Sequence, residues 1–84
     1  MNLSLIDISG KAIVVSQFTL MANTKKGNRP SFIQAAPPEI ASPLVDYFIE
    51  KMNFRGVVTQ SGEFGAHMLV EIHNDGPVSI WLEK

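Results

Sequence analysis

Apolar and polar residues alternate in several stretches of the chain, with the two-residue spacing of β-strands. In Lys11–Leu20 both alternating sets are largely apolar and β-branched residues are frequent, so a central strand covered on both faces is predicted. Val57–Thr59 is predicted to be a short strand, and Phe64–Ile72 alternates like a strand buried on one face. Val78–Leu82 is predicted to be the last strand.

Apolar residues recur at helical spacing in Pro38–Met52. They form a single stripe that is typical of packing against a core, made of Leu44, Val45, Phe48, Ile49 and Met52. Two helix starts agree with the sequence. In the first, Ser42 is the N-cap and Pro43 takes the first helical position. In the second, the helix begins at Pro38, and Pro43 lies inside it and should kink it.

Residues 21–38 separate the first strand from the helix and contain Gly27 and three prolines, so they are predicted to form a long loop. A loop of this length in a compact domain is usually functional or mobile. The order of strand, loop, helix and three further strands predicts an α+β fold. We expect a single domain over residues 1–84, with a mainly antiparallel sheet and one helix packed on it.

The composition is that of a globular protein. Of the 84 residues, 45% are hydrophobic and 18% are charged, and the length allows one domain with a modest core. No apolar run approaches the roughly 18 residues of a membrane span, so no membrane association is expected. The absence of cysteine excludes disulfides, a thiolate nucleophile and a Cys-type zinc site, and it fits a cytoplasmic protein.

Charge gives little support for extensive binding to nucleic acid. The formal net charge is −1, whereas proteins that bind nucleic acid broadly carry many Lys and Arg at phosphates. The one local cluster is Lys25, Lys26 and Arg29 within the long loop. From the residues alone, a solvated basic loop is the simpler interpretation, because most charged side chains face water.

Side chains suited to catalysis are present, but their spacing supports no familiar catalytic set. A hydroxyl such as that of Thr19 is a poor nucleophile without an adjacent base, and His67 and His73 lie on a different predicted strand. His67, Glu71 and His73 fit a polar strand face better than a metal site, and no metal or cofactor is expected. The acidic residues are scattered, which argues against paired carboxylates.

Catalysis by main-chain groups remains compatible with the sequence. An ester needs positioning, a water or a neighbouring hydroxyl, and hydrogen-bond donors aimed at the developing oxyanion. The main-chain N–H groups of Gln17, Phe18 and Thr19 could supply such donors if that strand end faces a pocket. On the simpler interpretation, Ser16 and Thr19 are ordinary strand residues.

Two motifs together resemble a known family. Gly76-Pro77 stands between two predicted strands, within Asn74–Ser79, although proline cannot donate to a strand ladder. Ser16-Gln17-Phe18-Thr19-Leu20 closes the first predicted strand. With the segments Asn23–Phe32 and Ser61–Met68, and in this order and separation, these motifs resemble D-aminoacyl-tRNA deacylases. The resemblance covers the chain and corresponds to the C-terminal portion of that longer family, since Met1–Leu5 resembles an internal stretch.

The resemblance implies the family's fold, here as a partial β-barrel, and a role for each motif. Its Ser-Gln-Phe-Thr segment lines the pocket for the 3′-terminal aminoacyl-adenosine, so Ser16, Gln17, Phe18 and Thr19 are the expected catalytic residues, with Thr19 either a nucleophile or a positioning residue. We favour positioning, because no base for Thr19 is visible. The other expected pocket residues are Phe64, Ala66 and Met68.

The resemblance also implies a filter for chirality and a contact with tRNA. A cis Gly76-Pro77 peptide would reach across a homodimer into the partner's pocket and exclude L-aminoacyl groups, because a main-chain wall rejects one enantiomer whatever its side chain. Asn74 and Ser79 flank this filter, with Ser79 in the place of the family's threonine. Lys25, Lys26 and Arg29 would lie near the tRNA end.

Three hypotheses about function follow. The first is an enzyme that hydrolyses the ester of D-aminoacyl-tRNA, recycling tRNA, with weak activity in isolation. The second is a non-catalytic remnant that dimerises or binds the tRNA end. The third, a generic peptide- or RNA-binding module, rests only on the basic loop. We expect the chain to form a tight oligomer or to pair with a chain that carries the missing strands, because a sheet cut from a barrel exposes strand edges and apolar faces.

Overall fold

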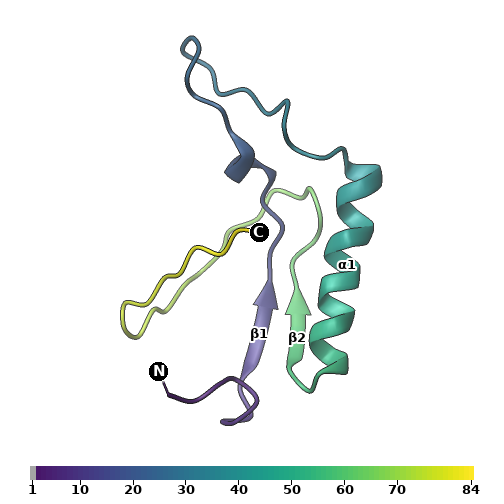
Figure 1. The fold of residues 1–84 in the computed structure, drawn as a ribbon, viewed down its shortest axis with the longest axis vertical. Helices are drawn as coiled ribbons and strands as arrows, with labels where there is room; N and C mark the ends of the chain where they lie inside the picture. The colour runs from purple at the N-terminus through teal and green to yellow at the C-terminus, as the bar shows by residue number, and fades with distance from the viewer. Residues whose placement is uncertain (1) are drawn as a thin grey trace.

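The computed structural model describes residues 2–84, so Met1, which opens the expected domain 1–84 and the stretch Met1–Leu5, lies outside the described residues. The elements follow in the order β1 (Lys11–Val14), the 3₁₀-helix η1 (Phe18–Met21), α1 (Pro38–Phe54) and β2 (Val58–Ser61). Figure 1 shows α1 lying along β2, with β1 on the other side of β2. The α+β prediction is therefore confirmed.

The sheet differs from the predicted one. β1 and β2 pair in parallel, with Lys11 opposite Val58 and Val14 opposite Ser61, and no antiparallel sheet forms among residues 2–84. The connection from β1 to β2 includes the long loop and α1, which is the kind of crossover that parallel strands need. The prediction of a mainly antiparallel sheet assumed ladders in the C-terminal third of the chain, and those ladders are not formed.

The first predicted strand is cut short. β1 ends at Val14, and the chain then stays extended to Gln17 (φ −151°, ψ 94°) before it turns into η1. The ladder continues by one bond after β2, because the main-chain N–H of Gly62 donates to the carbonyl oxygen of Val14 (3.1 Å). The alternating pattern through Leu20 is real, but only its first part has a partner strand.

The helix begins at Pro38, so the second of the two predicted starts is correct. Pro37 is its N-cap, and Pro43 lies inside the helix, where it cannot donate a hydrogen bond. At the other end, Gly56 adopts φ 92°, a conformation that glycine reaches without strain, and its N–H donates to the carbonyl oxygen of Asn53 (3.0 Å). This tight ending turns the chain directly into β2.

One side of α1 packs on the sheet. Val45, Ile49 and Met52 are half-buried there, but Leu44 remains 60% exposed and Phe48 53% exposed. Only part of the predicted apolar stripe therefore packs on the sheet. The exposed part is an apolar surface that another segment could cover.

A hydrogen-bonded link joins the end of α1 to β2. The main-chain N–H of Thr59 donates to Oδ1 of Asn53 (2.9 Å), and Nδ2 of Asn53 donates to the carbonyl oxygen of Ile49 (3.1 Å). Thr59 Oγ1 donates to the carbonyl oxygen of Val57 (2.8 Å). Val57 and Thr59 are the two buried residues of the part of the chain that the structure describes. This small core holds the parallel unit together.

The exposed surface is far larger than that of a compact protein. The chain of 9.2 kDa exposes 8098 Å², whereas a compact monomer of this mass exposes about 4,900 Å². Its radius of gyration is 15.3 Å, against about 12 Å for a compact domain of this length. Much of the excess is apolar, since Ile13, Ile33, Leu69, Ile72 and Leu82 are each at least 69% exposed.

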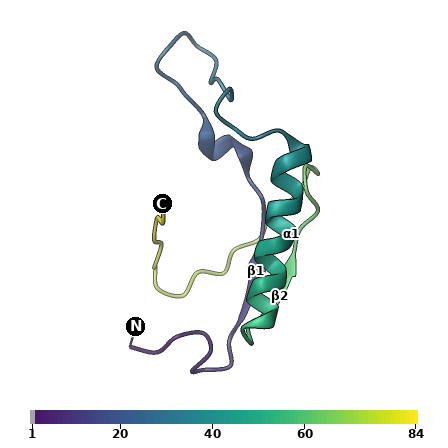
Figure 2. The same cartoon turned by 45° about the vertical axis from the view of Figure 1, so that its right-hand side comes forward.

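Residues 62–84, named here the C-terminal arm, account for part of this surface. The arm leaves the sheet, reverses its direction and returns so that its end lies beside η1, in both views (Figures 1 and 2). The predicted strands Phe64–Ile72 and Val78–Leu82 lie on it and carry no ladder among residues 2–84. An extended segment becomes a strand only when a second segment pairs with its N–H and C=O groups.

No helix in residues 2–84 combines the length and the apolar character that a membrane crossing requires.

Candidate functional site

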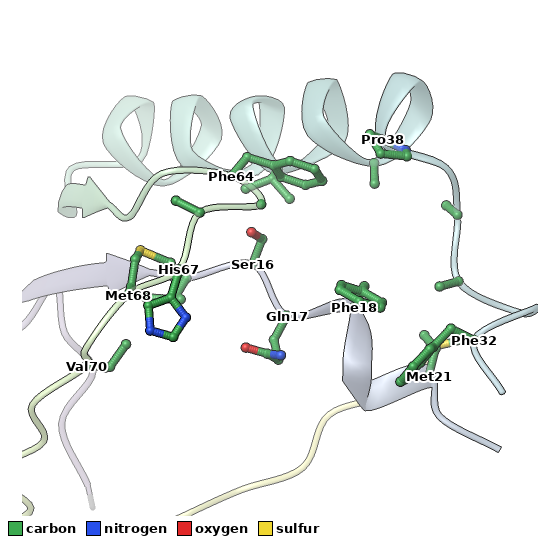
Figure 3. A pocket seen from close by; sticks show the side chains of 17 residues that line it. Ser16, Gln17, Phe18, Met21, Phe32, Pro38, Phe64, His67, Met68 and Val70 are labelled. Atoms are coloured by element: carbon green, nitrogen blue, oxygen red, sulfur yellow. The ribbon is translucent and has the colours of Figure 1, made fainter. Parts of the chain in front are cut away.

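A pocket of about 780 Å³ opens where the two parallel strands end. Val15 to Phe18 continue from β1 on one side of it, and Phe64 to Met68 follow β2 on the other (Figure 3). The loop before α1 and the first turns of α1 close the third side. Its volume lies within the range of small-molecule sites, and it has the common position of such sites at the carboxyl ends of parallel strands.

The first wall contains three of the four expected catalytic residues. Ser16, Gln17 and Phe18 line the pocket. The rings of Phe18 and Phe32 meet edge to face, with centroids 5.0 Å apart and planes at 73°. This aromatic pair joins the end of the first wall to the long loop, and aromatic pairs of this geometry are favourable.

The second wall contains the three expected substrate-binding residues of the arm, namely Phe64, Ala66 and Met68. A turn shapes it, in which the N–H of Ala66 donates to the carbonyl oxygen of Glu63 (3.2 Å) and Gly65 adopts φ 72°. Met68 also packs tightly on Gly62, where an added Cβ would lie 2.8 Å from the Met68 Sδ. The absence of a side chain at Gly62 therefore lets Met68 reach the pocket.

Sequence reasoning missed the third wall. Small and apolar residues form it, among them Ala35, Pro38, Ala41 and Val45. Their sequence shows ordinary helix and loop spacing, so nothing marked them as pocket residues. The Ala-Ala-Pro-Pro run before α1 was the available signal, because small side chains leave room beside a helix N-terminus.

Thr19 is not on the pocket wall but in η1, next to it. The Gln17 side-chain Nε2 donates a hydrogen bond to Thr19 Oγ1. Among residues 2–84 the main-chain N–H groups of Phe18 and Thr19 have no carbonyl partner, as expected for the first donors of a 3₁₀-helix. The pocket edge thus holds two free main-chain donors and a hydroxyl whose oxygen already accepts from an amide.

His67 is the single ionisable side chain on the pocket wall formed by residues 2–84. Figure 3 shows its ring beside Met68, on the wall that follows β2. The side-chain hydrogen bond of Thr19 within the described residues joins it to Gln17. The other pocket residues named above are uncharged, so the pocket is largely apolar.

The structure does not bring the Gly-Pro segment to this pocket. The Gly76–Pro77 peptide is cis, as the resemblance implied. Asn74, Gly76, Pro77 and Ser79 lie exposed on the C-terminal arm, away from the pocket walls of their own chain. An added Cβ at Gly76 would lie 2.7 Å from the main-chain nitrogen of Val78, so this position excludes any side chain.

The basic cluster lies on a closed hairpin. The N–H groups of Asn23 and Ser31 each donate to the other's carbonyl oxygen (2.7 and 2.8 Å), and Lys25, Lys26 and Arg29 lie exposed between them. Residues 23–31 are named here the basic hairpin. Figure 1 shows it projecting beyond η1, and the three basic side chains on it are exposed. The predicted loop is thus ordered at its base by a two-bond bridge.

The chain thus combines an α+β fold, a pocket at the ends of two parallel strands and an exposed Gly-Pro segment that lies away from that pocket. The D-Tyr-tRNA(Tyr) deacylase family model matches residues 1–83, and the chain belongs to this family. The resemblance based on the two motifs is therefore confirmed.

Individual relatives agree with this assignment. A protein named D-aminoacyl-tRNA deacylase from Thermomicrobium roseum is 60% identical over 84 residues, which are 100% of this chain and 54% of the relative. A protein of the same name from Clostridioides difficile is 53% identical over 84 residues, or 56% of its length. The chain thus spans about half the length of the curated relatives it matches.

The fold has a solved counterpart. The structure of the c-Myc DNA Unwinding Element Binding Protein superposes with a TM-score of 0.85 at 41% identity, covering 96% of this chain and 55% of the other. The similarity extends over almost all of the chain, so the arrangement of β1, α1, β2 and the arm is that of a known fold.

Proposed function

We propose that this chain carries the substrate pocket of an enzyme that hydrolyses the ester bond of D-aminoacyl-tRNA, releasing free tRNA and the D-amino acid. The observation that carries the proposal is the pocket itself, which joins Ser16–Phe18 and Phe64–Met68 although these segments are far apart in sequence. Both are segments on which the family resemblance rests. Family membership and the names of the relatives support the same reaction.

The free main-chain donors suit ester hydrolysis. Water attacks the ester carbonyl carbon, the carbonyl oxygen becomes an oxyanion, and the bond to the 3′ oxygen of the terminal ribose breaks as that oxygen takes up a proton. In the proposal, the N–H groups of Phe18 and Thr19 stabilise the oxyanion. An aminoacyl ester is already reactive, so positioning and these donors suffice without a side-chain base.

Thr19 serves as a positioning residue in this proposal. Its hydroxyl oxygen accepts from the Gln17 side chain, and an amide NH₂ group cannot remove a proton from it. The Thr19 proton remains free to donate to a substrate or water oxygen. Gln17 therefore orients Thr19, and Ser16 adds a second hydroxyl on the pocket wall.

Selection of the D form is assigned to the Gly-Pro segment of a partner chain in a homodimer. Gly76 and Pro77 are exposed and distant from their own pocket, so only a second copy could bring them to it. The tight contact at Gly76 supports a main-chain wall, because no side chain fits there. Asn74 and Ser79 would hold this wall in place.

The remaining half of the family's length and the partner chain would complete the fold. The open sheet face, with Ile13 69% and Val58 58% exposed, is unusual for parallel strands, which are normally covered on both faces. In the proposal, the missing strands pair with the arm and close the partial barrel, so residues 1–84 act as one domain within a larger unit. The excess apolar surface supports this.

The tRNA would approach over the basic hairpin. Lys25, Lys26 and Arg29 are exposed on it and can contact phosphates. A substrate of this kind places the enzyme in the cytoplasm. The small number of basic residues agrees with a contact limited to the tRNA end.

The test uses a chimera that joins this chain to the part of the Thermomicrobium roseum relative outside the matched residues. We expect the chimera to hydrolyse D-tyrosyl-tRNA and to leave L-tyrosyl-tRNA intact, and the 84-residue chain alone to be weak or inactive. Equal hydrolysis of both esters would contradict the filter. Absence of hydrolysis by a folded chimera would favour the non-catalytic alternative.

A second variant tests whether Thr19 is a positioning residue or a nucleophile. We expect Thr19→Ala in the chimera to lower kcat/KM only partly, by about 10-fold, since positioning hydrogen bonds contribute about 1–2 kcal/mol. Ser42→Ala, in α1 and outside the pocket wall, is the matched hydroxyl control for folding. A loss as complete as removal of a nucleophile would overturn the positioning role.

A further inference from the structure

A second hollow of about 380 Å³ lies between the basic hairpin and the end of the C-terminal arm. Trp81 and Glu83 form its side on the arm, and Leu20, Met21, Lys25 and Gln34 belong to the other side. It is not part of the substrate pocket, but Met21 lines both. Figures 1 and 2 both show the end of the arm near η1, and Leu20 and Met21 of η1 line this hollow.

Its chemistry differs from that of the substrate pocket. Trp81 is 67% exposed, and its indole Nε1 donates to Glu83 Oε2 (3.2 Å). That bond orients the carboxylate and leaves Glu83 Oε1 free to accept. Lys25 is on the opposite rim, and its main-chain N–H is held by Asn23 Oδ1 (3.0 Å) at the foot of the hairpin. An aromatic face, an oriented acceptor and a cation thus surround one small space.

We propose that this hollow binds the nucleotide that precedes the terminal adenosine of the substrate, and that it selects cytosine there. The inference rests on the proposed function, since it places the terminal aminoacyl-adenosine in the substrate pocket. The unpaired 3′ end of tRNA reads CCA, so the next base is a cytosine. A strand that leaves the pocket past the shared Met21 enters this hollow.

Each group in the hollow matches one part of a cytidine nucleotide. Bases stack on exposed aromatic side chains whatever their identity, so Trp81 supplies affinity. A carboxylate accepts from the cytosine N4 amino group, whereas uracil presents an acceptor oxygen at that position, so Glu83 supplies selectivity. Lys25 contacts a phosphate on the side of the basic hairpin. A bare basic groove would attract any sequence, but the carboxylate makes this hollow selective.

The kinetic test uses the chimera and D-tyrosyl-tRNA that ends in CCA or in CUA. We expect the CCA substrate to have a KM about 10-fold lower than the CUA substrate, with kcat unchanged. Glu83→Gln, whose amide both donates and accepts, should make the two KM values equal. Trp81→Ala should raise both KM values by about 10-fold, and Trp81→Phe should restore most of the loss.

Matched controls keep the interpretation unambiguous. Glu71→Gln removes the same charge from an exposed part of the arm outside the hollow and should leave the CCA preference intact. Equal KM values for CCA and CUA substrates with the unaltered chimera would overturn the proposal. So would a CCA preference that survives in Glu83→Gln.

Binding without turnover distinguishes this inference from the proposed function. Trp81 is the only tryptophan of the chain, so its fluorescence, isolated as the difference from Trp81→Phe, reports directly on stacking. The trinucleotide CCA should quench it at concentrations about 10-fold lower than CUA does. If the chimera shows this preference but no hydrolysis, the proposed function fails and the cytosine site stands. If hydrolysis is normal and neither trinucleotide changes the fluorescence, the cytosine site fails alone.

Discussion

The β1–α1–β2 unit and the C-terminal arm are both rich in apolar residues with strand-like alternation, yet only the unit forms a ladder. In the unit, Val57 and Thr59 are buried and Asn53 ties the helix to β2. In the arm, Leu69 is 90% exposed and Leu82 88% exposed. The difference lies in partners: β1 pairs with β2, whereas no segment of residues 2–84 forms a ladder with the arm. Alternation of apolar and polar residues makes a segment suitable for a β-sheet, but a ladder forms only when a second segment pairs with it.

The largest expected effect is a difference in amide hydrogen exchange between the β1–α1–β2 unit and the C-terminal arm. In the chain alone, we expect the Thr59 amide to be protected and the amides of residues 67–82 to exchange almost freely. In the chimera, the arm amides should gain about 100-fold protection, because they enter a sheet. Amide exchange followed by mass spectrometry measures both. Strong protection of the arm in the isolated chain would break the comparison.

The next largest effect is a loss of stability when the link between α1 and β2 is removed. Asn53→Ala removes the acceptor for the buried Thr59 N–H and the donor to Ile49. We expect the free energy of unfolding of the chimera to fall by about 1–3 kcal/mol, the cost of leaving a buried polar group unpaired. Urea denaturation measures it. Asn28→Ala, at the exposed tip of the basic hairpin, is the matched control, with an expected change within about 0.5 kcal/mol.

A smaller effect concerns the junction between the two regions. Gly62→Ala places a Cβ 2.8 Å from the present position of Met68 Sδ, so Met68 must shift on the pocket wall. The Met68 side chain is flexible, so we expect a loss of about 1 kcal/mol, seen as a roughly fivefold drop in kcat/KM. In a Met68→Ala background the same change should have no further effect. A full loss in both backgrounds would show that Gly62 acts through its backbone.

The smallest effect concerns the turn before β1, which is held by local bonds alone. The Ser4 main-chain N–H donates to Asp7 Oδ2 (2.8 Å), and this bond holds the pKa of Asp7 below its ordinary value of 3.8. A lowered pKa means that the turn is favoured above pH 3.8 and loosens as the pH falls through the pKa of folded Asp7. The Ser4 amide shift, followed by NMR, should titrate with Asp7. Asp7→Asn should abolish that titration.

The sequence predicted well what depends on neighbours along the chain. The existence of the helix follows from the 3.6-residue spacing of Leu44–Met52, and the segments Ser16–Phe18 and Phe64–Met68, which line the pocket, are ones that the family motifs single out. Spacing could not decide whether the helix starts at Pro38 or after Ser42. A start at Pro38 places Pro43 inside the helix and removes one main-chain hydrogen bond, and spacing does not show whether other contacts offset that loss.

The remaining differences have one physical origin. The sheet direction, the early end of β1 and the unpaired strands at Phe64–Ile72 and Val78–Leu82 all depend on which segments meet in space. The strand-like alternation of apolar and polar residues continues into Phe18–Met21, so the sequence predicted a strand where the structure has the 3₁₀-helix η1. The third pocket wall, with Ala35 and Ala41, arises from small residues that leave space, and small residues carry no periodic signal.

The parallel register has a consequence during protein synthesis. Val58 lies about 47 positions after its partner Lys11, and a ribosome adds about 5–20 residues per second, so β1 waits for several seconds without β2. During that interval the nascent Ala12–Val15 segment is an unpaired apolar edge outside the exit tunnel. The pocket can therefore close only after β2 has been made and has paired with β1.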